Sequence, residues 1–185
     1  MLDELGIDCC IFGVQKAFAL PPGLAVFSAS ERALERAKGI PGRGYYFDFL
    51  EFAAADEKDN TPSTPCISLI YAMDLQLERI FAEGLEKRWQ RHSEMAQFMR
   101  NWVRQQGFGL LPAEPYRSVT LTCATNDRGI DLAQLKKRLG ERGYAFDDGY
   151  GKLKGKTFRV AHMGDMQLDD LKGITAEMEG ILQDL

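Results

Sequence analysis

A long amphipathic pattern between Pro65 and Gly107 constrains the fold of this chain more than any other feature. Apolar residues recur there at steps of three or four, and this spacing predicts helix. The apolar positions include Ile67, Ile70, Leu77, Ile80, Phe81, Leu85, Trp89, Met99, Trp102 and Val103. The pattern is too long for one ordinary globular helix, so we predict a bend or a break near residues 82–84.

The residues after this pattern predict a small α/β unit. Asp131 is the expected N-cap of a helix that ends near Gly143, and a stripe over residues 168–182 predicts a terminal helix. Three short segments predict strands on the basis of their alternation and composition. These segments are residues 118–123, 144–146 and 157–162.

Near the start of the chain, a short apolar run at residues 9–14 is followed directly by Gln15 and Lys16. A run of this length predicts a buried strand, and a second strand is expected at residues 24–28. The Pro-Pro-Gly sequence at residues 21–23 cannot continue a strand or a helix, so it predicts a turn between them. Lys16 is therefore expected at a strand end, where α/β proteins usually build their sites. A partly desolvated lysine there can serve as an amine nucleophile toward a carbonyl, and the alternative is a lysine that extends to water.

The segment between the second strand and the long helical pattern is less regular. Ser30 is the expected N-cap of a short helix over residues 31–38. The aromatic residues at 45–49 are compatible with a strand or with a packed loop, and the segment from there to Asn60 is predicted to be a surface loop.

Composition limits the class of protein. The chain has 185 residues, which suits one domain, or one small domain with part of another. Its net charge of −4 argues against a dedicated nucleic-acid surface, and no apolar run approaches the roughly 20 residues needed to span a bilayer. The first residues lack the pattern of a signal peptide, so we expect a cytoplasmic protein. Four scattered cysteines and two histidines argue against a metal site.

Three segments along the chain, taken in order, resemble a known family. They are Gly13-x-Gln15-Lys16 with Pro21-Pro22-Gly23-Leu24, then Thr61-Pro62-Ser63-Thr64-Pro65, and then Phe158-Arg159-Val160-Ala161-His162-Met163-Gly164-Asp165. Together they resemble the class V pyridoxal-phosphate (PLP) aminotransferases of the alanine–glyoxylate and serine–glyoxylate type. The resemblance covers essentially the whole chain.

The resemblance implies an α/β protein of the fold-type I PLP-transferase class. Residues 1–82 would be the C-terminal part of the PLP-binding large domain, with the last strands of its sheet, and residues 83–185 would be the small C-terminal α/β domain. Family members carry a large N-terminal portion before the lysine, which supplies a glycine-rich phosphate turn, a stacking aromatic and an aspartate for the pyridine nitrogen. We therefore expect this sequence to correspond to a C-terminal half, as a truncated reading frame or as one piece of a split protein.

The resemblance also implies roles for four residues around the cofactor. Lys16 would be the catalytic Schiff-base lysine, and Gln15 would contact the cofactor near its phosphate. Ser63 and Thr64 would reach the cofactor phosphate of the neighbouring subunit, which implies a homodimer. A helix N-terminus is a ready phosphate site, and the alternative is that Ser63 or Thr64 simply caps the following helix.

Arg159 is the candidate substrate-binding residue. It follows Phe158 in an apolar strand, and burying an unpaired guanidinium is costly, so it needs a partner. A substrate α-carboxylate offers a bidentate match, and the alternative is an ion pair with Asp165 or Asp147. With the resemblance, we favour the substrate role. His162 would either orient Arg159 or the substrate, or serve in packing.

The resemblance thus implies PLP-dependent transamination between alanine or serine and glyoxylate or pyruvate. The alternative function is a non-catalytic fragment that dimerises or completes a partner chain. This alternative predicts that apolar surface on residues 9–14 and 65–85 is exposed unless something covers it, so oligomerisation is expected.

Overall fold

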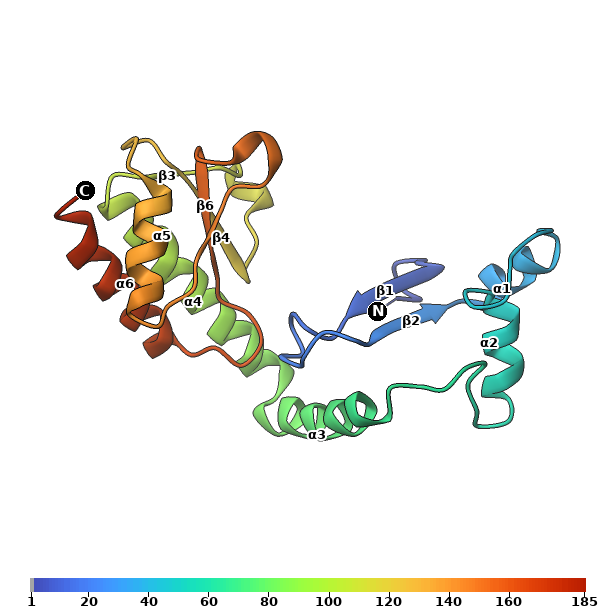
Figure 1. Ribbon diagram of the computed structural model, residues 1–185. Helices are drawn as coiled ribbons and strands as arrows, with labels where there is room; N and C mark the ends of the chain where they lie inside the picture. Colours follow the sequence, from blue (N-terminus) through green and yellow to red (C-terminus); the bar gives the residue numbers. More distant parts are fainter. Residues whose placement is uncertain (1) are drawn as a thin grey trace. The chain divides into compact units, whose positions relative to one another are not determined.

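The computed structural model describes residues 2–185, and these residues form two compact units that divide between Glu78 and Arg79 (Figure 1). The division falls within one helix, shortly before residue 82, the last residue of the first predicted domain. None of the described helices is both long and apolar enough to cross a bilayer.

In the first unit, strands β1 (Cys9–Gly13) and β2 (Ala25–Ala29) form an antiparallel hairpin, as predicted. The side chain of Ile11 is 75% exposed and that of Phe12 is 36% exposed. The prediction that this strand is buried is therefore wrong for the described residues, because β1 and β2 form a sheet of only two strands. The exposed apolar surface expected under the alternative function is confirmed here.

Two short helices follow the hairpin. Helix α1 (Glu31–Lys38) begins after Ser30, whose hydroxyl accepts a backbone hydrogen bond from the first turn, so the predicted N-cap is confirmed. Helix α2 (Phe49–Asp56) occupies the segment predicted to be a surface loop, and that prediction is wrong. The Asp48 carboxylate caps this helix, and the three consecutive alanines within it favour helical backbone.

The long amphipathic pattern forms helices α3 (Ile67–Glu83) and α4 (Leu85–Gln105), and the predicted break is confirmed at Gly84. Gly84 has φ 85°, a left-handed backbone conformation that interrupts the helix and that glycine adopts without steric cost. Apolar side chains of α3 are exposed, as the alternative function predicts. They are Ile67, Ile70, Tyr71, Leu75 and Phe81.

The second unit contains a four-stranded antiparallel sheet in the order β3-β4-β6-β5. Its strands are β3 (Gly109–Leu110), β4 (Leu121–Thr125), β5 (Asp147–Asp148) and β6 (Thr157–Ala161).

The sheet differs from the prediction at two strands. Strand β4 starts later than expected, because the Ser118 hydroxyl bonds locally to the side chain and the backbone N–H of Thr120. Residues 144–146 do not form a strand, since the Tyr144 N–H bonds back to the carbonyl of Leu139 at the end of a helix.

Helices α4 and α5 (Leu132–Glu141) lie against one face of this sheet, and α6 (Leu168–Leu182) packs against both of them (Figure 1). Asp131 caps α5 as predicted, and α6 is the predicted terminal helix. The fully buried side chains of this unit include Met95, Met99, Leu135, Leu139, Phe158, Leu171, Met178 and Ile181. Because side chains alternate along a strand, the neighbour of Phe158 on β6, Arg159, lies on the opposite face of the sheet.

Candidate active site

Lys16 lies in the turn directly after β1, the strand-end position that the sequence predicts. The turn has a defined backbone, since the Lys16 carbonyl accepts the Ala19 N–H at 3.0 Å and the Val14 carbonyl accepts the Leu20 N–H at 3.2 Å. Val14 is fully buried and anchors the turn, whereas the Lys16 side chain is exposed. An amine is thus displayed from a fixed segment of backbone.

Gln15 occupies the same turn and is also exposed. Its side-chain amide folds back over Gly13, so a side chain at residue 13 would require the exposed Gln15 amide to move. In this arrangement Gly13 leaves room for the Gln15 amide beside the lysine.

Ser63 and Thr64 are exposed residues in the irregular segment before α3. The backbone there is held from both sides, because the Thr61 hydroxyl donates to the Ser63 carbonyl at 2.7 Å and the Tyr45 hydroxyl donates to the Pro62 carbonyl at 2.8 Å. Helix α3 starts at Ile67, so neither Ser63 nor Thr64 stands at its N-cap, and the capping alternative is wrong. Within residues 2–185, neither side-chain hydroxyl has a hydrogen-bond partner.

Arg159 is half-buried on β6, on the sheet face opposite the core. Its Nε donates to the backbone carbonyl of Asp148 at 3.1 Å. The predicted alternative of an ion pair with Asp147 or Asp165 is wrong, because each of those carboxylates pairs with another basic side chain. The two terminal nitrogens of Arg159 have no partner among the described residues and can meet an anion.

Cys123 stands directly opposite Arg159 in the β4–β6 register. Burial raises the pKa of the Cys123 thiol, while a hydrogen bond with Thr157 and the charge of Arg159 act in the opposite direction. The thiol is therefore protonated near neutral pH and does not compete as an anion for the Arg159 guanidinium.

His162 is fully buried and has a structural role. Its Nδ1 lies 3.1 Å from the Val119 carbonyl and its Nε2 lies 2.8 Å from the Thr122 hydroxyl. A carbonyl only accepts, so we assign the proton to Nδ1, and Nε2 then accepts from Thr122. Burial lowers the pKa of His162 to about 4. These contacts hold the end of β6 to β4. Of the two roles considered for His162, they support the packing role over the orientation of Arg159 or the substrate.

An ion cluster at the junction of α3 and α4 was not predicted from the sequence. The Glu83 carboxylate accepts from Arg91 at 2.7 Å and from Arg88 at 2.8 Å, and Arg91 also donates to the carbonyls of Gly164 and Met166. Hydrogen bonds from Arg91, and then from Arg88, lower the pKa of Glu83 to about 2. The cluster joins segments that are distant in the sequence, so a local pattern could not predict it. The one local sign of it is the three-residue spacing of the two arginines, which places them on the same face of α4.

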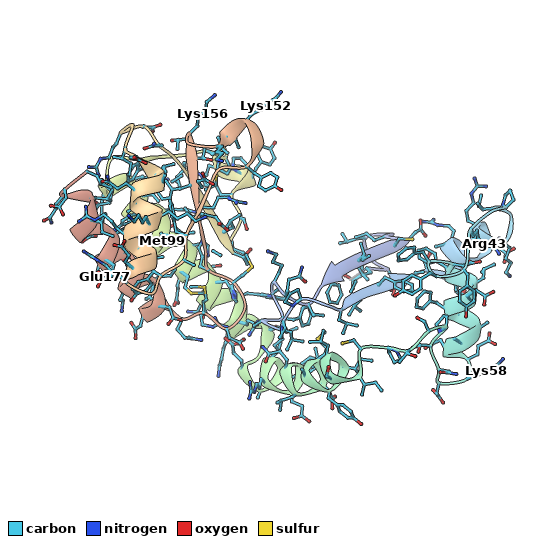
Figure 2. The ribbon with its side chains drawn as sticks, viewed as in Figure 1. Arg43, Lys58, Met99, Lys152, Lys156 and Glu177 are labelled. Carbon is cyan, nitrogen blue, oxygen red and sulfur yellow. The ribbon has the colours of Figure 1, made fainter. Side chains whose placement is uncertain are left out.

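The structure brings some of the predicted site residues together. Gln15 and Lys16 share one turn, and Ser63 and Thr64 adjoin each other before α3 in the same unit, whereas Arg159 belongs to the other unit. Figure 2 shows the side chains of both units. Among residues 2–185, no group of three or more histidine, cysteine or acidic side chains is arranged to hold a metal ion.

Comparison with known proteins identifies the family. Residues 1–152 match the sequence profile described as Aminotransferase class-V. The chain is 37% identical over 166 residues to an uncharacterized aminotransferase of Methanocaldococcus jannaschii, covering 88% of this chain and 43% of that protein. It is 33% identical over 189 residues to the serine–glyoxylate aminotransferase of Methylorubrum extorquens, covering 98% of this chain and 47% of the relative.

The fold agrees with this match. The crystal structure of alanine–glyoxylate aminotransferase from Nostoc sp. superposes with a TM-score of 0.90 at 28% identity, over 98% of this chain and 49% of that one. The chain thus spans about half the length of the curated relatives it matches. On this evidence the chain belongs to the class-V aminotransferases, a family of PLP-dependent enzymes.

Proposed function

We propose that this chain carries the lysine and the carboxylate-binding arginine of a PLP-dependent transamination site. The amino donor would be alanine or serine and the acceptor glyoxylate or pyruvate, in line with the names of its relatives. The observation that carries the proposal is Arg159, a half-buried arginine whose terminal nitrogens lack a protein partner within residues 2–185.

The residues around Lys16 fit the cofactor. A primary amine at a fixed turn matches the aldehyde of PLP, and the Gln15 amide beside it is a neutral donor suited to the phosphate. The Ser63 and Thr64 hydroxyls supply further donors, and we propose that they serve the phosphate of a second subunit in a homodimer. When bound, PLP supplies an electron sink for the bond broken at the substrate α-carbon.

The chain's own residues then have two tasks. The Lys16 amine holds the cofactor and, once released, moves the proton at the substrate α-carbon. Arg159 orients the substrate through two parallel hydrogen bonds to its α-carboxylate, while the Asp148 carbonyl fixes the guanidinium through Nε.

Substitution of Arg159 by lysine tests this assignment. A lysine cannot offer the planar pair of donors, so alanine binding to the chain with PLP should weaken at least about tenfold. The free energy of unfolding should fall by only about 1–2 kcal/mol, because the hydrogen bond from Nε to the Asp148 carbonyl is lost but no ion pair is lost. Calorimetric titration and denaturant unfolding measure the two quantities. Arg104→Lys, at an exposed arginine on α4 whose side chain has no interaction in the described residues, is the matched control. Unchanged binding with a large loss of stability would overturn the substrate role.

A second candidate function is a non-catalytic chain that dimerises or completes a partner polypeptide. The exposed apolar side chains of β1 and α3, such as Ile11 and Tyr71, favour it.

A further inference from the structure

A groove of about 480 Å³ lies between α1 and α2 in the first unit. On α1 it is lined by Glu31, Leu34, Glu35 and Lys38. On the other side it is lined by Leu50, Ala53 and Ala54 of α2 and by Glu57, the C-cap of that helix. Each set follows the spacing i, i+3, i+4, i+7, so each helix turns one continuous face toward the groove. The proposed transamination site uses none of these residues.

The two helices are held in place by Arg43 in the connection between them (Figure 2). Its Nε donates to the Asp48 carboxylate at 2.9 and 3.0 Å, and Asp48 is the N-cap of α2. Its Nη1 donates to the carbonyls of Ala37 and Ile40 at the end of α1, at 3.1 and 2.6 Å. One guanidinium therefore fixes the end of α1 to the start of α2, so the groove has a defined shape.

The floor of the groove is apolar and concave. Leu34 and Leu50 are half-buried, and the small side chains of Ala53 and Ala54 leave space between the helices. A floor of this kind accepts apolar side chains from a ligand.

The rim of the groove is acidic. Glu35 is neutralised by Lys38 at 2.6 Å, but Glu31 and Glu57 have no ion-pair partner among residues 2–185. Both lie at the helix ends away from Arg43, so one end of the groove carries uncompensated negative charge. A ligand with basic groups beside an apolar surface complements this arrangement.

We propose that this groove docks a short amphipathic helix of a partner protein, with lysine or arginine beside leucine-sized apolar side chains. Two helix faces of equal period form the groove into which a third helix packs its side-chain ridges. Helix α1 has eight residues and is about 12 Å long at 1.5 Å per residue, which matches two turns of a partner helix. The contact area is small, so the interaction is weak and transient.

Three synthetic helical peptides test the proposal. They share one pattern of leucine and alanine and differ in carrying lysine, glutamine or glutamate at the flanking positions. Binding to the full chain is measured by NMR titration, following the methyl groups of Leu34, Leu50, Ala53 and Ala54. The lysine peptide should bind at least about tenfold more tightly than the glutamate peptide and should shift these methyl signals.

Charge reversal makes the test specific. The variant Glu31→Lys/Glu57→Lys should prefer the glutamate peptide, and Glu31→Gln/Glu57→Gln should lose most of the preference if the first variant folds poorly. Glu51→Lys/Asp56→Lys makes the same charge change on α2 at exposed positions outside the groove, and should leave the preference for lysine intact.

Three results would overturn the proposal. They are no binding of the lysine peptide to the wild-type chain, methyl shifts confined to other residues, and a preference that follows net charge equally in the groove and control variants. None of these results depends on PLP or on transamination, so the proposed function is tested separately.

Discussion

At the residue scale, His162 links stability to pH. Its folded pKa of about 4 is lower than its ordinary value of 6.5, so folding favours the neutral ring. The stabilisation is complete above pH 6.5 and is lost as the pH falls through about 4, because the folded state then has to bind a proton in a buried site. The amount is on the order of 3 kcal/mol.

The measurement is the free energy of unfolding of the wild type and of His162→Gln across this pH range. The variant should be less stable at neutral pH, and the difference between the two proteins should shrink on acidification. A difference that does not vary with pH would contradict the assignment of a neutral buried histidine.

Individual site residues differ in how far the sequence could predict them. Lys16 and Gln15 lie where a short apolar run ends, which a local pattern can show. The hydrogen-bond partner of Arg159 could not be predicted. The Asp148 carbonyl lies next to Arg159 because of the register in which β5 pairs with β6. That register depends on backbone pairing, and the residue pair Asp147–Asp148 has no apolar alternation to indicate a strand.

At the element scale, the ion cluster at Glu83 holds the start of α4 to the loop after β6. Glu83→Gln keeps the shape of the side chain but removes the charge facing Arg88 and Arg91, and should cost about 1–3 kcal/mol. The folded pKa of Glu83 is about 2, below its ordinary 4.5, so this stabilisation is present above pH 4.5 and is lost as the pH falls through about 2.

Chemical denaturation at neutral pH measures this cost. Glu35→Gln, which removes an exposed carboxylate paired with Lys38, is the control and should change the free energy of unfolding by less than about 1 kcal/mol. Equal effects of the two substitutions would show that the cluster contributes no more than a surface pair.

The break between α3 and α4 depends on the backbone of Gly84. A Cβ there would meet no neighbouring atom, but the φ of 85° is unfavourable for alanine, so Gly84→Ala should destabilise the protein by about 1–2 kcal/mol. Gly140→Ala in α5 is the matched control. It also meets open space, has no positive φ, and should raise stability by about 0.5–1 kcal/mol. Thermal unfolding of both variants measures these two effects. If Gly84→Ala raised the stability, this would contradict the positive φ at the junction of α3 and α4.

The elements that the sequence predicts well are those with a long period or a cap. The helical stripe and a glycine predict α3, α4 and their break, and Asp131 and Ser30 predict the starts of α5 and α1. Helix α2 was missed because its sequence, from Phe49 to Asp56, is short and mostly apolar, so no clear period distinguishes it from a packed loop.

At the scale of the whole molecule, the exposed apolar side chains should drive association. Ile11→Lys and Tyr71→Lys each remove a large exposed apolar group, and each should raise the dissociation constant at least about tenfold if that group is buried on association. Sedimentation velocity over a range of concentrations measures this. Tyr116→Lys, at an exposed aromatic outside β1 and α3, is the control. A wild-type chain that stays monomeric at every concentration would contradict the expectation.

The exposure of β1 also shows where sequence patterns stop short. Apolar content and length indicate that a strand belongs in a core, but burial depends on which other elements cover it. Among the described residues only β2 pairs with it, and the chain spans about half the length of its curated relatives. The apolar residues of β1 therefore predict that a strand forms, but they do not predict which other elements cover it.

The most direct test of the central claim is to mix the chain with PLP, reduce the mixture with borohydride and locate the adduct by peptide mass spectrometry. We predict a stoichiometric adduct on Lys16, which is lost in Lys16→Ala. Labelling spread over exposed lysines such as Lys152 and Lys154, or no label on Lys16, would contradict the assignment of Lys16 as the cofactor lysine.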